Sequence, residues 1–324
     1  MESASLPLGG RSALERPPLA RVPDRALRYG LTALAVAILA LISYFFIRLV
    51  GEARPAFARA GVFGFVFNNE WNVSAERFGA LPLVVGTLIT SSLALVIGVP
   101  VAVATAIYTT ELCPLRVRAP LTVLVELLAA VPSVVYGLWG IFFLAPKLQP
   151  AEQWVADRLS FIPFVGGGAV TIPNYLITGL VLAIMILPIV SAISREVMAT
   201  VPPDHKEAAL ALGATRWEMI RMAVLPYCRS GIVGGAMLGL GRALGETIAV
   251  TMVIGNRPEI SSSLFSTGYT LPSVIANEFT EAVGNVYLGS LFYLGLILVL
   301  ITVVVNVLAR LLTWRFTGSE PTAA

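Results

Sequence analysis

The sequence predicts an all-α, polytopic membrane protein with six transmembrane helices and one amphipathic helix outside the bilayer. Of its 324 residues, 57% are hydrophobic and 13% are charged, and the mean hydropathy of +0.84 is too high for a soluble domain. Six apolar runs reach the roughly 20 residues that a helix needs to cross the hydrocarbon core. These runs are residues 29–50, 81–108, 120–144, 174–193, 230–255 and 288–312.

The chain begins with a basic segment, residues 1–28, which contains five arginines, several prolines and few apolar residues. This composition predicts a disordered tail, followed by residues 29–50 as an uncleaved first transmembrane helix. The segment Ala58-Arg-Ala60 resembles a signal-peptide cleavage site. A signal peptide is therefore the alternative, although the apolar run before that site is longer than the usual hydrophobic region of such peptides.

The distribution of lysine and arginine over the loops predicts the orientation. If the basic tail lies inside, the inner segments hold fourteen Lys and Arg residues and the outer loops hold six. The excess predicts that both termini, residues 1–28 and 314–324, are cytoplasmic tails. The same bias accounts for the net charge of +3, so no nucleic-acid partner is expected. We expect a multi-pass protein of a cytoplasmic membrane.

Residues 51–80 are predicted to form an extracytoplasmic loop, with Trp71 and Phe78 as anchors at the membrane interface. The core, residues 81–313, opens with a span rich in small and hydroxylated residues, among them Thr87, Thr90 and Ser91. Such residues permit close helix packing, which is the favoured interpretation. The alternative is that these three hydroxyls line a path for solute.

The third span carries one carboxylate, Glu126, about two turns inside its cytoplasmic end. We expect it to pair with a loop arginine near the inner surface. The segment Ala130-Val-Pro132-Ser133 predicts a kink at mid-membrane. In the outer loop that follows, the run Gly166-Gly167-Gly168 lacks the spacing of a phosphate-binding loop and predicts a flexible turn.

An amphipathic helix is predicted after Val201-Pro-Pro203-Asp204, with Asp204 as its N-cap. Apolar residues then recur at steps of three and four as far as Val224, which predicts a helix of about four turns. Gly213 inside this helix costs about 1 kcal/mol relative to alanine, so we expect a neighbour to pack closely over it. The helix could lie on the inner leaflet or fit a groove on a soluble partner.

The fifth span carries two charges, Arg242 and Glu246, within an apolar sequence. Arg242 lies about 18 Å from Ser230 at helical rise, close to mid-membrane, and Glu246 follows one turn later on the same helix face. A buried ion pair is one interpretation. The favoured interpretation is that the Arg242 guanidinium binds a passing oxyanion and that Glu246 weakens this binding so that the anion is released. Intramembrane charges are costly and are usually functional. Five glycines predict close packing of this span, namely Gly231, Gly235, Gly239, Gly241 and Gly245.

The sequence also lacks several kinds of site. His205 is the only histidine, and no Cys/His spacing typical of a metal site occurs, so no metal and no resident cofactor are expected. No hydrolase or nucleotide-binding motif is present, and we expect no catalytic residues in this chain. Cys113 and Cys228 both fall on the predicted cytoplasmic side, where thiols stay reduced.

The segment EAALALG followed by Leu-Pro resembles the EAA loop of ABC importer permeases. That resemblance implies a type I ABC importer permease fold, in which a coupling helix within residues 201–226 sits in a cleft of a cytoplasmic ATPase. The coupling positions it implies are Glu207, Ala208, Ala209, Gly213, Leu225 and Pro226, the last two turning the chain back into the bilayer. Ala223 departs from the isoleucine that the family often has there.

A closer resemblance rests on FGALPLVVGTLITS, ELLAAVPSVVYGLWG and GLGRALGETIAVTMVIGN, which together look like the PstC-type permeases of bacterial phosphate-specific ABC importers. It implies translocation of phosphate by Arg242 and Glu246. The implied partners are a second homologous permease, a dimeric ATPase that uses the ATP, and an extracytoplasmic phosphate-binding protein. The alternatives are a permease for molybdate or sulfate, and a non-transporting membrane scaffold that only recruits an ATPase.

Overall fold

The computed structural model describes residues 21–159, 161, 170–261 and 263–317. The chain divides into two units, residues 1–51 and 52–324. In the first unit the described residues form the beginning of helix α1 (Arg21–Ala60), so residues 21–28 of the predicted tail are helical. The predicted turn at Gly166-Gly167-Gly168 lies outside the described residues.

The second unit is helical throughout its described length apart from loops and one isolated β-bridge between Asn72 and Arg77. Three short π-helical segments, Tyr108–Leu112, Gly140–Leu144 and Ile220–Val224, extend or join its helices. After the end of α1, its α-helices are α2 (Val62–Phe67), α3 (Leu81–Ile107), α4 (Leu115–Ala130), α5 (Ser133–Trp139), α6 (Ala145–Arg158), α7 (Tyr175–Ala199), α8 (Pro203–Ala211), α9 (Arg216–Met219), α10 (Leu225–Gly245), α11 (Ile248–Val253), α12 (Leu271–Glu278) and α13 (Asn285–Thr317).

Six membrane crossings are predicted, and the described residues contain five helices that are long and apolar enough to cross a membrane. A sixth crossing exists if α4 and the helix after it count as one broken span, since the two segments are bent by 94° at their junction. Pro132 lies at this junction, so the predicted kink is confirmed but is a full break. Glu126 of α4 pairs with Arg195 at 2.8 Å, so the expected arginine partner is present but belongs to the end of helix α7 and not to a loop.

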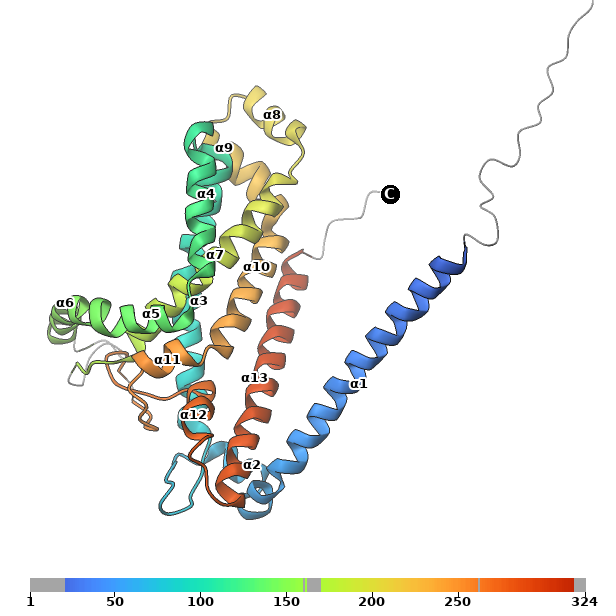
Figure 1. The fold of residues 1–324 in the computed structure, drawn as a ribbon. Helices are drawn as coiled ribbons and strands as arrows, with labels where there is room; N and C mark the ends of the chain where they lie inside the picture. The colour runs from blue at the N-terminus through green and yellow to red at the C-terminus, as the bar shows by residue number, and fades with distance from the viewer. Residues whose placement is uncertain (1–20, 160, 162–169, 262, 318–324) are drawn as a thin grey trace, which may run out of the picture. The chain divides into compact units, whose positions relative to one another are not determined.

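In the second unit, α3 packs along α7, and α10 packs against α7 as well (Figure 1). The helix contacts are close because glycines form them: a Cβ on Gly98 of α3 would lie 3.0 Å from the Ala183 carbonyl oxygen of α7. Helices α8 and α9 lie at one end of this unit, which we call the α8 end. Helices α2 and α12 lie at the opposite end, the α12 end, and α5 and α6 run sideways from the end of α4.

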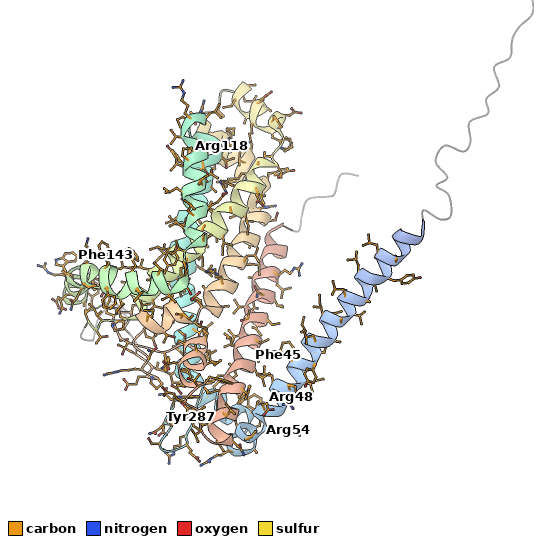
Figure 2. All side chains as sticks on the ribbon, in the orientation of Figure 1. Phe45, Arg48, Arg54, Arg118, Phe143 and Tyr287 are labelled. Atoms are coloured by element: carbon orange, nitrogen blue, oxygen red, sulfur yellow. The ribbon has the colours of Figure 1, made fainter. Side chains whose placement is uncertain are left out.

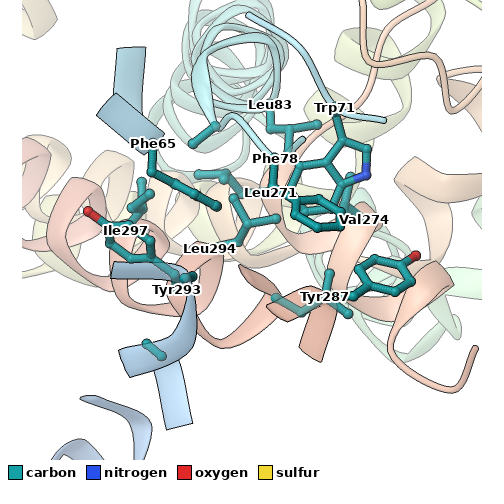
Figure 3. Close-up of a cluster of buried hydrophobic side chains, with 14 of the residues drawn as sticks. Phe65, Trp71, Phe78, Leu83, Leu271, Val274, Tyr287, Tyr293, Leu294 and Ile297 are labelled. Atoms are coloured by element: carbon teal, nitrogen blue, oxygen red, sulfur yellow. The ribbon is translucent and has the colours of Figure 1, made fainter. Parts of the chain in front are cut away.

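A buried aromatic cluster forms the core of the α12 end (Figure 3). Trp71 and Phe78 belong to it and are only 8% and 5% exposed. The Phe78 ring stacks on Tyr287 of α13 at 5.2 Å between centroids. The interpretation of Trp71 and Phe78 as interfacial anchors is therefore wrong, because both side chains are core residues of the loop between α2 and α3.

One carboxylate holds this cluster to α12. A single oxygen of Glu278, Oε2, accepts hydrogen bonds from Trp71 Nε1 at 3.0 Å and from the Tyr287 hydroxyl at 2.7 Å. The neighbouring Tyr269 is buried, and its pKa is raised chiefly by desolvation. Glu278 thus joins the loop before α3, more than two hundred residues away in the sequence, to α12 and to Tyr287 at the start of α13 (Figure 2).

Glu278→Ala is expected to lower the free energy of unfolding by about 2–4 kcal/mol, because each orphaned, largely buried donor costs about 1–3 kcal/mol. Thermal unfolding in detergent, followed by tryptophan fluorescence, measures the effect. Glu281→Ala is the matched control, since Glu281 is exposed three residues further on and is expected to leave the melting temperature unchanged. Equal melting temperatures for both variants would contradict the role of Glu278.

Candidate functional site

The helix that carries Arg242 enters from the α8 end. Residues Arg216–Gly245 form one continuous helical stretch that includes the π-helical segment Ile220–Val224. Pro226 lies in the first turn of α10, directly after that segment. Proline has no backbone N–H to donate, and the wider π-helical turn before it accommodates its ring. The predicted turn at Leu225-Pro226 is therefore wrong, because the chain passes through these residues as a helix.

Arg242 and Glu246 do not share a helix face, contrary to the prediction. Helix α10 ends at Gly245, and Glu246 has extended backbone angles of φ −70° and ψ 127°. The residue Glu246 is 9% exposed, and its Oε1 accepts a bond of 3.4 Å from the Ala249 N–H at the start of α11. Within the described ranges these two residues form no ion pair. Arg242 is exposed on the surface of this chain.

Two interrupted helices meet beside Arg242. One interruption separates α4 from α5 at Val131-Pro132, and the other separates α10 from α11 at Glu246 and Thr247. Helices α5 and α11 pack together closely, since a Cβ on Gly137 would lie 2.7 Å from Met252 Sδ. In a membrane, interrupted helices are tolerated only inside protein or around a polar cavity, and they often mark transport sites.

Tyr136 is a residue of this site that sequence reasoning missed. Its hydroxyl donates a 2.7 Å bond to the Leu128 carbonyl oxygen. The usual helical donor to that oxygen would be residue 132, a proline without an N–H, and the Val131 N–H donates to it at 3.4 Å. The sequence did contain a signal for this role, since Tyr136 lies four residues after Pro132. A tyrosine hydroxyl near a helix break can donate to a carbonyl oxygen that the proline leaves without its usual donor.

The glycines of α10 lie on two faces. The face with Gly231, Gly235 and Gly239 packs against α7, as predicted, and a Cβ on Gly239 would lie 2.8 Å from Val190. In contrast, a Cβ on Gly241 or Gly245 would meet no described atom outside α10 within 4 Å. Arg242 is exposed and lies nearly one turn before Gly245, so these two residues share a side of α10 that the described residues leave open.

The predicted four-turn amphipathic helix is two helices. Helix α8 ends at Ala211, and Gly213 follows with φ +86°, a conformation that side chains rarely adopt. The N–H of Ala214 donates to the Ala209 carbonyl and that of Gly213 to the Leu210 carbonyl, which is a Schellman end. A Cβ on Gly213 would meet no described residue of this chain within 4 Å, and the backbone angle by itself explains the glycine.

The second helix, α9, begins with a capping box. Thr215 Oγ1 accepts from the Glu218 N–H at 3.3 Å, and Glu218 Oε2 accepts from the Thr215 N–H at 2.8 Å. These bonds lower the pKa of the Glu218 carboxyl. The predicted N-cap of α8, Asp204, is also displaced: Pro202 is the N-cap, and Asp204 lies in the first turn.

The turn between α8 and α9 presents an apolar surface to the outside of the chain. Leu212 is 90% exposed, and Leu210 and Trp217 are exposed beside it. Of the EAA positions, Glu207 and Ala208 are exposed, whereas Ala209 packs partly against the core of the α8 end. Exposed apolar residues grouped with a charged residue are typical of a protein-binding surface.

The three hydroxyls predicted as packing or path-lining residues are all buried within the chain. Thr87, Thr90 and Ser91 each donate to a backbone carbonyl four residues earlier on α3. Thr87 Oγ1 also accepts a 2.9 Å bond from the Leu271 N–H at the start of α12. These bonds favour the packing interpretation.

Comparison with known proteins agrees with this geometry. Residues 98–318 match the family model described as "Binding-protein-dependent transport system inner membrane component". The chain is 46% identical over 287 residues to "Phosphate transport system permease protein PstC" of Mesorhizobium japonicum, covering 87% of this chain and 88% of the relative. It is 45% identical over 291 residues to the protein of the same name from Pasteurella multocida, covering 88% and 90% of the two chains.

A solved bacterial alginate ABC transporter, in complex with its alginate-bound periplasmic protein, contains a chain of the same fold. The TM-score is 0.63 at 16% identity, over 93% of this chain and all (100%) of that chain. This likeness concerns the fold alone. The sequence matches decide the assignment, and the chain belongs to the family of binding-protein-dependent transport system inner membrane components.

Proposed function

We propose that the chain is the permease subunit of an ATP-driven importer that translocates inorganic phosphate delivered by an extracytoplasmic binding protein. The observation that carries this proposal is the position of Arg242, which is exposed on α10 beside two interrupted helices. The planar guanidinium matches two oxygens of a tetrahedral oxyanion. The relatives named as phosphate permeases support phosphate as that anion.

Glu246 acts with Arg242 in this proposal. Its buried carboxylate caps the start of α11 in the present arrangement and is not engaged with the arginine. A rearrangement at the break between α10 and α11 brings Glu246 within reach of Arg242, which then releases the anion. The break supplies the flexible joint that such a rearrangement needs.

The chain acts in a complex. The open face of α10, which includes Gly241 and Gly245, meets a second, homologous permease, since small residues permit close helix approach. The α8–α9 turn, with Glu207, Ala208, Ala209 and Gly213, contacts a dimeric ATPase that hydrolyses the ATP. Leu225 and Pro226 join this turn to α10 without a bend, so movement at the ATPase reaches Arg242. The α8 end is cytoplasmic, and the binding protein contacts the α12 end.

Two other functions remain as alternatives, and each predicts a different outcome in a transport measurement. A permease for sulfate or molybdate would carry those anions in place of phosphate. A scaffold would recruit the ATPase and transport nothing. The exposed Arg242 favours a transport function over a scaffold, because an unpaired charge at membrane depth is costly without a ligand.

The complete complex in proteoliposomes, with the loaded binding protein outside and ATP inside, tests the proposal. We expect ATP-dependent uptake of labelled phosphate that excess sulfate or molybdate does not reduce. Uptake of sulfate or molybdate in preference to phosphate would identify the other oxyanion permease. ATPase binding without uptake of any of the three anions would identify the scaffold.

A further inference from the structure

One ion pair at the α8 end connects two segments that are far apart in the sequence. Lys206 of α8 donates from Nζ to Oε1 of Glu111, in the π-helical segment that continues α3, at 2.7 Å. The two side chains are 23% and 7% exposed. Among the described residues it is the one ion pair that α8 makes.

The surroundings of this pair are apolar. Ile107, Val201, Ile220 and Cys228 belong to the buried cluster at the α8 end, and Ala209 of α8 packs against it. In such a site an ion pair is weakly screened by water and salt, and removal of one partner leaves a buried, uncompensated charge. Lys206 and Glu111 are thus bound more firmly than an exposed surface pair.

The helical hydrogen bonding of the backbone is interrupted on both sides of α8. On one side, Pro202 is the N-cap, and on the other side Gly213 ends the helix with a positive φ. Helix α8 is therefore a separate helix, and it is not continuous with α7 or with α9. The side-chain contacts of α8 therefore decide which neighbouring helix follows when α8 moves.

Helix α3 is held at its other end as well. Thr87 Oγ1 accepts from the backbone N–H of Leu271, the first residue of α12, and both residues are buried. Thr87 and Glu111 are separated by about 36 Å of helix at 1.5 Å per residue. Helix α3 with its π-helical extension therefore connects α8 at one end of the second unit to α12 at the other.

We propose that the Lys206–Glu111 ion pair is a positioning contact that transmits movement of α8 to α3, and through α3 to α12. This inference rests on the proposed function, in which the α8–α9 turn contacts the ATPase. It adds a second route of coupling to the continuous helix that leads from α9 to Arg242. The route through α3 reaches the α12 end, where the binding protein contacts the chain.

The test measures phosphate uptake per ATP hydrolysed by the full complex in proteoliposomes. The main variant carries Glu111→Gln and Lys206→Met together, because replacement of both members of a buried pair avoids an isolated charge and is often tolerated. We expect normal assembly with the ATPase and an uptake-to-hydrolysis ratio reduced about fivefold to tenfold, the lower part of the range for coupled sites. The exchange Glu111→Lys with Lys206→Glu is expected to restore most of the ratio.

The ion pair between Arg195 and Glu126 provides the matched control. Its length is 2.8 Å, and it joins α4 to α7, so neither of its residues belongs to α8 or α3. Arg195→Met with Glu126→Gln is expected to leave the ratio unchanged. A wild-type ratio in the Glu111→Gln, Lys206→Met variant would overturn the inference, as would an equal loss in the control.

One further variant separates this inference from the proposed function. Gly213→Ala alters the ATPase-contacting turn and leaves the ion pair in place. If it lowers the ratio and the ion-pair variant does not, the route through α3 is wrong and the ATPase contact stands. If Gly213→Ala also leaves the ratio unchanged, the assignment of the α8–α9 turn as the ATPase contact is itself wrong.

Discussion

Arg242→Gln is expected to abolish phosphate uptake by the assembled importer while assembly and membrane level stay normal. The guanidinium offers two hydrogen bonds to the anion, and each bond to a charged group is worth about 1.5–3 kcal/mol. Their loss lowers uptake by more than about 100-fold, since 1.4 kcal/mol corresponds to a factor of ten. The measurement is the initial rate of labelled phosphate uptake in proteoliposomes, normalised to the amount of complex.

Two further variants make this result specific. Arg242→Lys keeps the charge but loses the planar pair of donors, so we expect weak residual uptake. Arg158→Gln is the matched control: it removes one exposed arginine from the end of α6, which carries no part of the proposed anion site, and uptake is expected to remain normal. Wild-type uptake in Arg242→Gln would remove Arg242 from the anion path.

The apolar runs of the sequence predicted the helices well, because hydropathy over about 20 residues depends on local composition alone. The interruptions were harder to predict. Pro132 predicted a kink, but the 94° bend also depends on Gly137 and its contact with Met252 of α11. At Glu246 the apolar run continues without a proline, so no local signal separates α10 from α11.

The α8–α9 turn shows a local signal that was present and not used. Gly213 was interpreted as a packing residue within one helix, although Thr215 and Glu218 have the spacing of a capping box. Together these residues predict that one helix ends and another begins. The role of Trp71, by contrast, could not be predicted, because its partner Glu278 lies more than two hundred residues away in the sequence.

Gly213→Ala is expected to uncouple ATP hydrolysis from transport. A side chain at φ +86° costs about 1–2 kcal/mol, so the native turn between α8 and α9 becomes about fivefold to thirtyfold less favoured. Nothing in this chain lies within 4 Å of the added Cβ, so the effect acts through the backbone and not through a clash. Uptake per ATP hydrolysed is expected to fall, while ATPase activity and copurification of the ATPase persist.

The chain contains a matched control for this change. Gly284, in the loop before α13, also has a positive φ, +90°, and open space around its Cβ position. Gly284→Ala therefore imposes the same backbone cost at the α12 end, and we expect it to leave the ratio of uptake to hydrolysis unchanged.

Glu207→Lys, which reverses an exposed charge beside the α8–α9 turn, is expected to lower the ratio of uptake to hydrolysis as Gly213→Ala does. An equal reduction in both glycine variants would mean that the backbone strain acts on folding in general. A reduction confined to Gly213→Ala and Glu207→Lys would follow only if the α8–α9 turn receives the movement of the ATPase.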